Sequence, residues 1–345
     1  MSSTNSEILA NVIGIAKNKN VEADVILTQE EQLGLKADRG DLSEYKVTSS
    51  RCVGVRVVQG TQVGTSYSES VEQSSLETMV QTAIENAGYA KENPHEKICA
   101  EKQDITDWTA KTCLDDDTSV EDKVALTLAL ESGLSGRDIE AKAPYNAFSE
   151  IKYEVAMANT LGHACSHKER QFSCYTYALL DHEGKQSMHL GYEVGRQFKE
   201  LSAQRVTDEA YETAKDLLEG TPIPTGSYET IFTTDCLNDL IGAFGMCWSG
   251  MSAMKDINPL RDKVGETVAH PEFSLYDDPA IQGGFSLQAF DSEGFATMRT
   301  PIVENGKLST FLHNSVTSSF FGLTNTANGS RGTKGSLGVS PSHLC

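Results

Sequence analysis

The sequence TDCLNDLIGAFGMCWSG, residues 234–250, decides how the fold of this chain is interpreted. It follows a predicted short strand over 228–233 and leads into an acidic, glycine-rich segment over 276–294. The stretch predicts a helix, but it contains several glycines, each of which costs ~1 kcal/mol relative to alanine in a helix. We therefore expect a compensating feature: close packing on another backbone or on a partner chain, a ligand, or a break in the helix.

Composition narrows the class of protein. The chain has 345 residues, enough for two or three domains, and 29 basic against 49 acidic residues give a net charge of −20. Because such a chain is repelled by phosphate backbones, we expect no direct binding to nucleic acid. No segment is apolar over the ~20 residues of a membrane span, and the N-terminus does not resemble a signal peptide. The eight scattered cysteines lack a C-x-x-C pair, which favours reduced thiols and a cytoplasmic location.

The first part of the chain predicts a helix, several strands and a second helix. Apolar residues at helical spacing predict the first helix over 6–18, and Ser70-Val71-Glu72-Gln73 is a capping-box candidate for the second. Glycine-containing turns separate neighbouring strands. The predicted strands are 23–28, 33–37, 44–48, 51–58 and 62–67.

The middle of the chain predicts a helix, three strands and another helix. Thr118 and Glu121 form a capping pair for a helix to about residue 130, and Thr207 begins a later helix that stops at Gly220. Further on, Asn305-Gly306 is the strongest short hairpin signal in the chain. The predicted middle strands are 147–159, 169–181 and 185–192.

These patterns predict an α+β, multi-domain protein. An N-terminal mixed sheet with flanking helices is followed by a β-rich middle part and a β-rich C-terminal domain. The polar stretch between the first two is expected to run over the surface, and prolines at 222 and 224 mark the last boundary. The predicted divisions are 1–92 for the N-terminal domain, 93–117 for a linker, 118–222 for the middle domain with its helices, and 223–345 for the C-terminal domain.

Several motifs, in this order across nearly the whole chain, resemble the TldD/PmbA family and most closely its PmbA (TldE) branch. Singly they are weak, and their order makes them fairly specific. Besides 234–250 they are the valine-rich RCVGVRVVQG at 51–60, the turn ANTLG at 158–162, PTGSY at 224–228, DDP at 277–279, FDSEG at 290–294 and Asn305-Gly306.

The resemblance implies a zinc-peptidase scaffold without its zinc ligands. In the TldD branch the helix corresponding to 234–250 carries a His-Glu-x-x-x-His motif, with two imidazoles for zinc and a glutamate base. In this chain those places fall on Gly242, Ala243 and Cys247. Since Gly and Ala can neither bind a metal nor move a proton, we expect no catalytic residue, no metal and no cofactor in this chain. Zinc is expected in a TldD-type partner.

The function implied by the resemblance is that of a PmbA/TldE-type subunit, itself non-catalytic. It would pair with a TldD-type chain in a heterodimer that degrades or matures unfolded peptides, and family members are also called modulators of DNA gyrase. The alternative is a stand-alone peptide-binding or regulatory protein without protease activity. A third, less favoured hypothesis is a self-sufficient hydrolase that uses Cys247 or the His163/His167 pair.

The end of the chain departs from the family pattern. Family members continue beyond the position of the last residues, 339–345. We therefore expect an incomplete C-terminal domain, whether from a truncated chain, a fragmentary gene or a divergent short member.

Three groups of residues carry possible chemistry. His163 and His167 have the i, i+4 spacing of zinc ligands on a helix, but they precede a β-rich stretch, which favours a solvated or hydrogen-bonded surface pair. Cys247 is a lone cysteine on an apolar face, where core packing is favoured over nucleophilic chemistry. The remaining residues of that face are Leu240, Phe244 and Met251.

The third group is acidic. Its carboxylates are possible contacts for a cation, a peptide or a partner, although Asp-containing turns of this kind more often stabilise their own backbone. Its members are Asp277, Asp278, Asp291 and Glu293. The chain has no phosphate-binding glycine loop and no G-x-S-x-G nucleophile elbow, so nucleotide binding is not supported.

Overall fold

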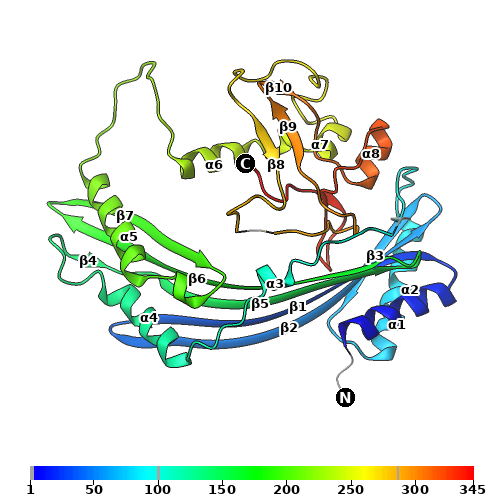
Figure 1. Ribbon diagram of the computed structural model, residues 1–345, viewed down its shortest axis with the longest axis horizontal. Helices are drawn as coiled ribbons and strands as arrows, with labels where there is room; N and C mark the ends of the chain where they lie inside the picture. Colours follow the sequence, from blue (N-terminus) through cyan, green and yellow to red (C-terminus); the bar gives the residue numbers. More distant parts are fainter. Residues whose placement is uncertain (1–3, 99–101, 286) are drawn as a thin grey trace.

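A long, curved antiparallel sheet forms the frame of the molecule (Figure 1). The computed structural model describes residues 4–98, 102–285 and 287–345. The strands of the sheet follow the order β3-β2-β1-β5-β6, and β4 and β7 also pair with β6. They are β1 Glu22–Asp38, β2 Asp41–Gln59, β3 Gln62–Ser68, β4 Ala141–Lys142, β5 Asn146–Asn159, β6 Ala164–His182 and β7 Lys185–Gly195.

The sheet is continuous from the N-terminal to the middle part of the chain. β1 pairs with β5 from Asp24, opposite Asn159, to Leu35, opposite Phe148. The prediction of separate strands at 23–28 and 33–37 is wrong, because β1 continues through the polar residues between them. Those residues stay in the ladder with β2, where Glu30 lies opposite Ser50. A polar residue on an open face of a sheet does not interrupt backbone pairing.

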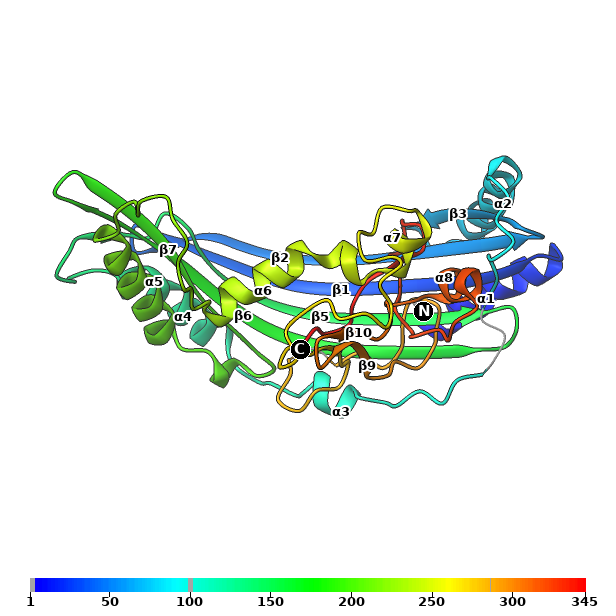
Figure 2. The same cartoon turned by 90° about the horizontal axis from the view of Figure 1, so that it is seen from above.

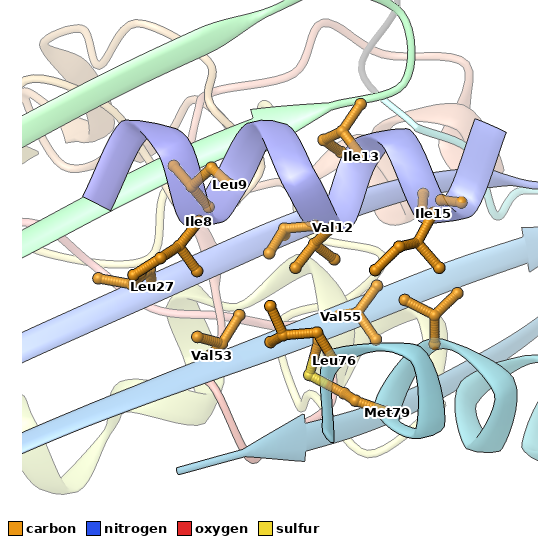
Figure 3. Close-up of a cluster of buried hydrophobic side chains, with 14 of the residues drawn as sticks. Ile8, Leu9, Val12, Ile13, Ile15, Leu27, Val53, Val55, Leu76 and Met79 are labelled. Carbon is orange, nitrogen blue, oxygen red and sulfur yellow. The ribbon is translucent and has the colours of Figure 1, made fainter. Parts of the chain in front are cut away.

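At one end of the sheet, α1 (Asn5–Asn18) and α2 (Gln73–Tyr89) build the largest apolar cluster. Apolar side chains of α1 meet those of β1, β2 and α2, as Figure 3 shows for Val12, Leu27 and Leu76. The predicted capping box at 70–73 is wrong. The cap position of α2 is Glu72, which makes no side-chain capping bond, whereas the Ser70 hydroxyl accepts a hydrogen bond from the Glu72 N–H in the turn before the helix.

At the other end, the helices of the middle part cover the same sheet. The helix predicted from Thr118 begins at Val120, because Ser119 accepts the hydrogen bond from Asp122 N. The later helix begins before the predicted Thr207, because Ser202 supplies its cap and Val206 is fully buried. These helices are α4 Val120–Ser132, η1 Phe198–Glu200 and α5 Ala203–Leu218, whereas the short α3, Thr109–Thr112, lies in the predicted linker and contacts β6.

The segment predicted as a linker, 93–117, contributes to packing between the long sheet and residues 223–345, which are called the third region from here on. Ile105 and Trp108 pack against buried residues of β1 and β5 and against Phe290, and Thr112 is fully buried. The prediction that this stretch runs over the surface is therefore wrong for these residues and for Ile98, which is 3% exposed. Residues 99–101 lie outside the described residues.

The third region lies on the concave side of the long sheet (Figures 1 and 2). It contains a small sheet in the order β10-β9-β8 and a two-stranded sheet of β11 and β12 around its own apolar cluster. Its elements are α6 Thr234–Ala243, η2 Gly245–Trp248, α7 Gly250–Met254, β8 Leu275–Asp277, β9 Thr300–Glu304, β10 Lys307–Leu308, α8 Ser315–Phe321, β11 Gly329–Ser330 and β12 Gly338–Val339.

Two local predictions in this region have opposite outcomes. The hairpin at Asn305-Gly306 is confirmed: both residues have positive φ, 49° and 80°, and they join β9 to β10. The strand predicted over 228–233 is wrong, since no strand forms there and Ile231 is 98% exposed. A short apolar run without a neighbouring strand has no backbone partner to pair with. In the described part of the chain, no helix is long and apolar enough to cross a membrane.

Candidate functional site

The helix predicted over 234–250 is divided into three short helical segments. A break in the helix, one of the features expected from its glycines, is therefore present. α6 ends at Ala243, a turn of 3-10 helix carries Cys247, and α7 begins at Gly250. Gly250 also shows close packing, because a Cβ there would lie 2.4 Å from Nδ1 of His313. Its lack of a side chain thus lets α7 lie against the segment that carries His313.

The three positions of the family's zinc motif do not fit a zinc ion. Gly242 and Ala243 are exposed at the end of α6 and have no side-chain donor. Cys247 is 6% exposed, and burial raises the pKa of its thiol, which disfavours the thiolate that would bind a metal. Among the residues that the structure describes, no group of three or more His, Cys, Asp or Glu is arranged to hold a metal ion.

The apolar face predicted on this segment is only partly buried. Cys247 lies in the interior as expected, which disfavours a role as a nucleophile. The expectation is wrong for Leu240 and Phe244, which are 41% and 51% exposed. α6 has no fully buried residue, and of its apolar side chains Ile241 packs against the apolar cluster of the third region.

His163 and His167 do not form a pair. His163 precedes β6, and its Nε2 lies 2.8 Å from the carbonyl oxygen of Gly294 in the third region. His167 lies within β6, and along a strand residues four apart are separated by about 13 Å. Both are buried rather than on the surface, at 4% and 9% exposure, and burial lowers the pKa of His167.

Two of the four predicted acidic residues lie at the end of β8. Asp277 is buried, and its carboxylate accepts hydrogen bonds from the backbone N–H groups of Ser342 and His343 and from the Asn328 side chain. Asp278 accepts a hydrogen bond from Ala280 N in its own turn, and its other oxygen lies 3.3 Å from Nε of Arg299.

Asp291 and Glu293 lie together in a second place. Oδ1 of Asp291 accepts from Glu293 N at 2.9 Å, and Oδ2 accepts from Gly329 N at 2.8 Å. Glu293 accepts hydrogen bonds from the N–H and the hydroxyl of Ser315. A Cβ on Gly329 would lie 2.8 Å from Asp291 and 2.9 Å from Glu293, so only glycine fits between the two carboxylates. Their role as peptide or partner contacts stays a prediction.

The sequence analysis missed the charged cluster that surrounds Glu293. Arg56 of β2 is fully buried; its Nη2 lies 2.7 Å from Oδ2 of Asp24 and 3.6 Å from Oε1 of Glu293. Its Nη1 lies 3.3 Å from Glu96, and Arg331 makes a second ion pair with Asp24. The cluster therefore joins the long sheet, the linker and the third region. The available signal was an arginine inside the apolar run VGVRVV at 53–58.

With Asp291 beside Glu293, the cluster contains four carboxylates and two guanidinium groups. The members are Asp24, Glu96, Asp291, Glu293, Arg56 and Arg331. Burial and the nearby charge of Glu293 raise the pKa of Asp291 to about 7. Burial also raises the pKa of Glu96. The carboxylates raise the pKa of Arg56 despite its burial, whereas burial and the charge of Arg56 lower the pKa of Arg331. Near neutral pH the cluster is therefore poised to hold a proton on an acidic side chain.

Of the hollows beside the long sheet, two lie near residues discussed above or have largely aromatic walls. One has a volume of about 270 Å³ and lies between the sheet and 287–292, with Met157, His167 and Arg331 in its walls. The other has a volume of about 560 Å³ and lies over β6 and β7. Its walls are largely aromatic and apolar, including Tyr175, Tyr177, Met188, Leu190, Tyr192 and Val194.

Comparison with known proteins identifies the class of protein. Three profiles match successive parts of the chain: PmbA/TldA metallopeptidase domain 1 over residues 23–87, the central domain over 114–218 and the C-terminal domain over 225–345. Together these matches cover more than half of the chain and place it in a metallopeptidase family. It belongs to the TldD/PmbA family.

Individual relatives agree with this assignment. The metalloprotease PmbA homolog of Haemophilus influenzae is 22% identical, over 91% of this chain and 70% of that protein. A crystal structure from Thermotoga maritima, described as a candidate modulator of a DNA gyrase, has a TM-score of 0.87 at 24% identity and covers 99% of this chain and 77% of that one. The crystal structure of TldE from Thermococcus kodakarensis has a TM-score of 0.79 at 16% identity. The match covers 98% of this chain and 77% of that one.

Proposed function

We propose that this chain is a non-catalytic subunit of PmbA/TldE type that works with a zinc-carrying TldD-type partner. The observation that carries the proposal is the absence of any side-chain donor at Gly242 and Ala243. Family membership supports a peptidase-related role, and the structural likeness to TldE is consistent with that branch. Zinc, the glutamate base and the hydrolytic step then belong to the partner.

The surface of α6 is the proposed contact with that partner. Leu237, Leu240 and Phe244 are each at least 40% exposed, and Met246 beyond the helix is 45% exposed. Large apolar side chains gathered on one helix are typical of a surface that another chain covers. Because this segment carries the zinc-motif positions, a partner docked here would bring its own helix close to them.

The proposed substrate is an unfolded peptide held in the concave side of the sheet. Peptide backbone can be held at a strand edge, and the third region is one place for this. There, however, Thr267 bridges to β10 and Leu344 to Asp277 of β8. Both edges of that small sheet therefore already contact other segments of the chain, and peptide binding there would have to displace one of them.

The test uses the purified chain alone and with a TldD-type partner. We expect no stoichiometric zinc and no peptide cleavage by the chain alone, and cleavage together with co-elution when the partner is added. Zinc is measured by atomic emission, cleavage by mass spectrometry of an unfolded peptide, and co-elution by size-exclusion chromatography. Zinc and activity in the isolated chain would refute the proposal. A proposed cytoplasmic location agrees with the free thiols of six described cysteines, which are Cys52, Cys113, Cys174, Cys236, Cys247 and Cys345.

A stand-alone peptide-binding protein is the second candidate, and the aromatic hollow over β6 and β7 favours it. Tyrosine faces give large contact area at low entropic cost and suit peptides of varied sequence. Peptide binding by the chain, together with failure to associate with any TldD-type chain, would support this candidate over the first.

A further inference from the structure

β7 is an edge strand of the long sheet. Its eleven residues pair with β6 from Lys185, opposite His182, to Gly195, opposite Phe172. Among the strands that the structure describes, none pairs with its outer side. The N–H of Tyr192 points outward, because it donates a hydrogen bond to Glu209 of α5 at 3.4 Å. Backbone groups alternate along an antiparallel pair, so those of Leu190 and Val194 point outward as well.

One face of β7, called the bare face below, is largely exposed to solvent in the described structure. On the opposite face, Gly191 lies against α5 so closely that a Cβ there would be 2.0 Å from the carbonyl oxygen of Val206. Because side chains alternate along a strand, the residues with outward backbone groups carry their side chains on the bare face. Tyr192 is 52% exposed and Val194 48% exposed, and Tyr192 lies opposite Tyr175 of β6.

An acidic row on α5 runs beside this edge. α5 is antiparallel to β7, since Tyr192 meets Glu209 whereas Ser187 donates its hydroxyl hydrogen to the carbonyl oxygen of Ala214. Glu209, Glu212 and Asp216 are exposed and spaced to share one side of the helix. Basic groups nearby are already engaged: Lys185 donates to the carbonyl oxygen of Leu218, and Lys215 lies 3.4 Å from Asp138.

We propose that β7 binds an extended polypeptide segment as an additional strand, and that this segment is apolar at alternate positions and basic between them. Its apolar side chains would lie on the tyrosine-rich face beside Leu190 and Tyr192. Its basic side chains would lie on the α5 side, near Glu209 and Glu212. Main-chain hydrogen bonds would give affinity, and the alternation of apolar and charged surface would give selectivity. The proposal deepens the peptide-binding part of the proposed function and rests on it.

The test measures binding of a fluorescein-labelled peptide in which lysine alternates with valine and tyrosine. We expect the full chain to bind it, with affinity falling as salt is added, and to bind weakly a counterpart with glutamate for lysine. Leu190→Pro removes the outward N–H of residue 190, so this position can no longer donate a hydrogen bond to an added strand. Because proline is tolerated where an edge N–H faces solvent, the fold should persist, as circular dichroism will show. The variant should bind about tenfold more weakly, as for the loss of one or two backbone hydrogen bonds.

A second variant keeps the test independent of proline. Glu209→Gln, Glu212→Gln and Asp216→Asn together should weaken binding of the lysine peptide and reduce its salt dependence. The matched control neutralises three exposed acids on the distant α2 segment, Glu72, Glu77 and Glu85, and should bind like the unchanged chain. Equal binding by the unchanged chain and both β7-edge variants would overturn the inference. That result would leave the subunit proposal intact, because zinc content and co-elution with a TldD-type partner test it separately.

Discussion

Arg56 and Glu293 form a buried ion pair that links the long sheet to the third region, with Nη2 3.6 Å from Oε1. Neither side chain is more than 2% exposed. Arg56 also pairs with Asp24, and Asp24 pairs in turn with Arg331 of the third region. A buried charge is tolerated only when it is paired and hydrogen-bonded. The position of the third region on the sheet is therefore tied to this cluster.

Replacing Arg56 should destabilise the chain strongly. Arg56→Met keeps much of the side-chain volume but leaves Asp24, Glu293 and Glu96 with one guanidinium group fewer. Breaking a buried pair in this way typically costs about 3–5 kcal/mol. Urea-induced unfolding measures the change. Arg39→Met is the control, because that side chain is 91% exposed and its pair with Asp38 contributes about 0–1 kcal/mol. Similar losses for the two variants would contradict the prediction.

The Asp291 carboxyl should make stability depend on pH. Its pKa is 3.8 in its ordinary state and about 7 in the folded chain. Between these values the folded state holds a proton that the unfolded state has released. The contribution of this group to the free energy of unfolding is therefore complete below about pH 4 and is lost as the pH rises to about 7. Asp291→Asn should remove this part of the pH dependence.

The measurement compares unfolding by urea across this pH range in the unchanged chain and in Asp291→Asn. The comparison is needed because His313 acts in the opposite direction: burial lowers its pKa from 6.5 to about 4, so its contribution is lost as the pH falls. The difference between the two chains isolates Asp291. A difference that does not change with pH would show that Asp291 does not titrate as described.

A side chain at Gly54 should weaken the docking of the third region. A Cβ on Gly54 of β2 would lie 2.0 Å from the carbonyl oxygen of Thr333. Gly54→Ala must therefore displace the segment around Thr333, at a cost of about 1–3 kcal/mol. Gly34→Ala in β1 is the matched control, because its nearest neighbour would be 4.0 Å away. Thermal unfolding compares them, and an equal effect of both substitutions would contradict this contact.

The cysteines of the α6 segment should differ in reactivity. Cys236 is exposed on α6, whereas Cys247 is 6% exposed and burial raises the pKa of its thiol. Because the thiolate is the reactive form, iodoacetamide should modify Cys236 first. Mass spectrometry of proteolytic fragments gives the two rates. Faster modification of Cys247 would reopen the hypothesis of a nucleophilic thiol.

Local patterns predicted many elements correctly, because short-range chemistry decides them. Apolar spacing predicted the helix at Asn5–Asn18, and Asn305-Gly306 predicted the hairpin, since only residues that tolerate positive φ form that turn. The motifs also predicted the family, which the profile matches confirm. Where prediction failed, a neighbour in space decided the outcome: β1 stays one strand because β2 pairs with its polar middle.

The sequence by itself determined that Gly242 and Ala243 have no side-chain atom that could bind a metal, because the chemical groups of a residue do not depend on the fold. Only the tertiary structure decided which charges meet. Arg56 and Glu293 lie far apart in the chain, and the partner of a buried charge is set by how the third region lies on the sheet. The same holds for the bare face of β7, because an edge strand is recognised only once every neighbouring strand has been placed.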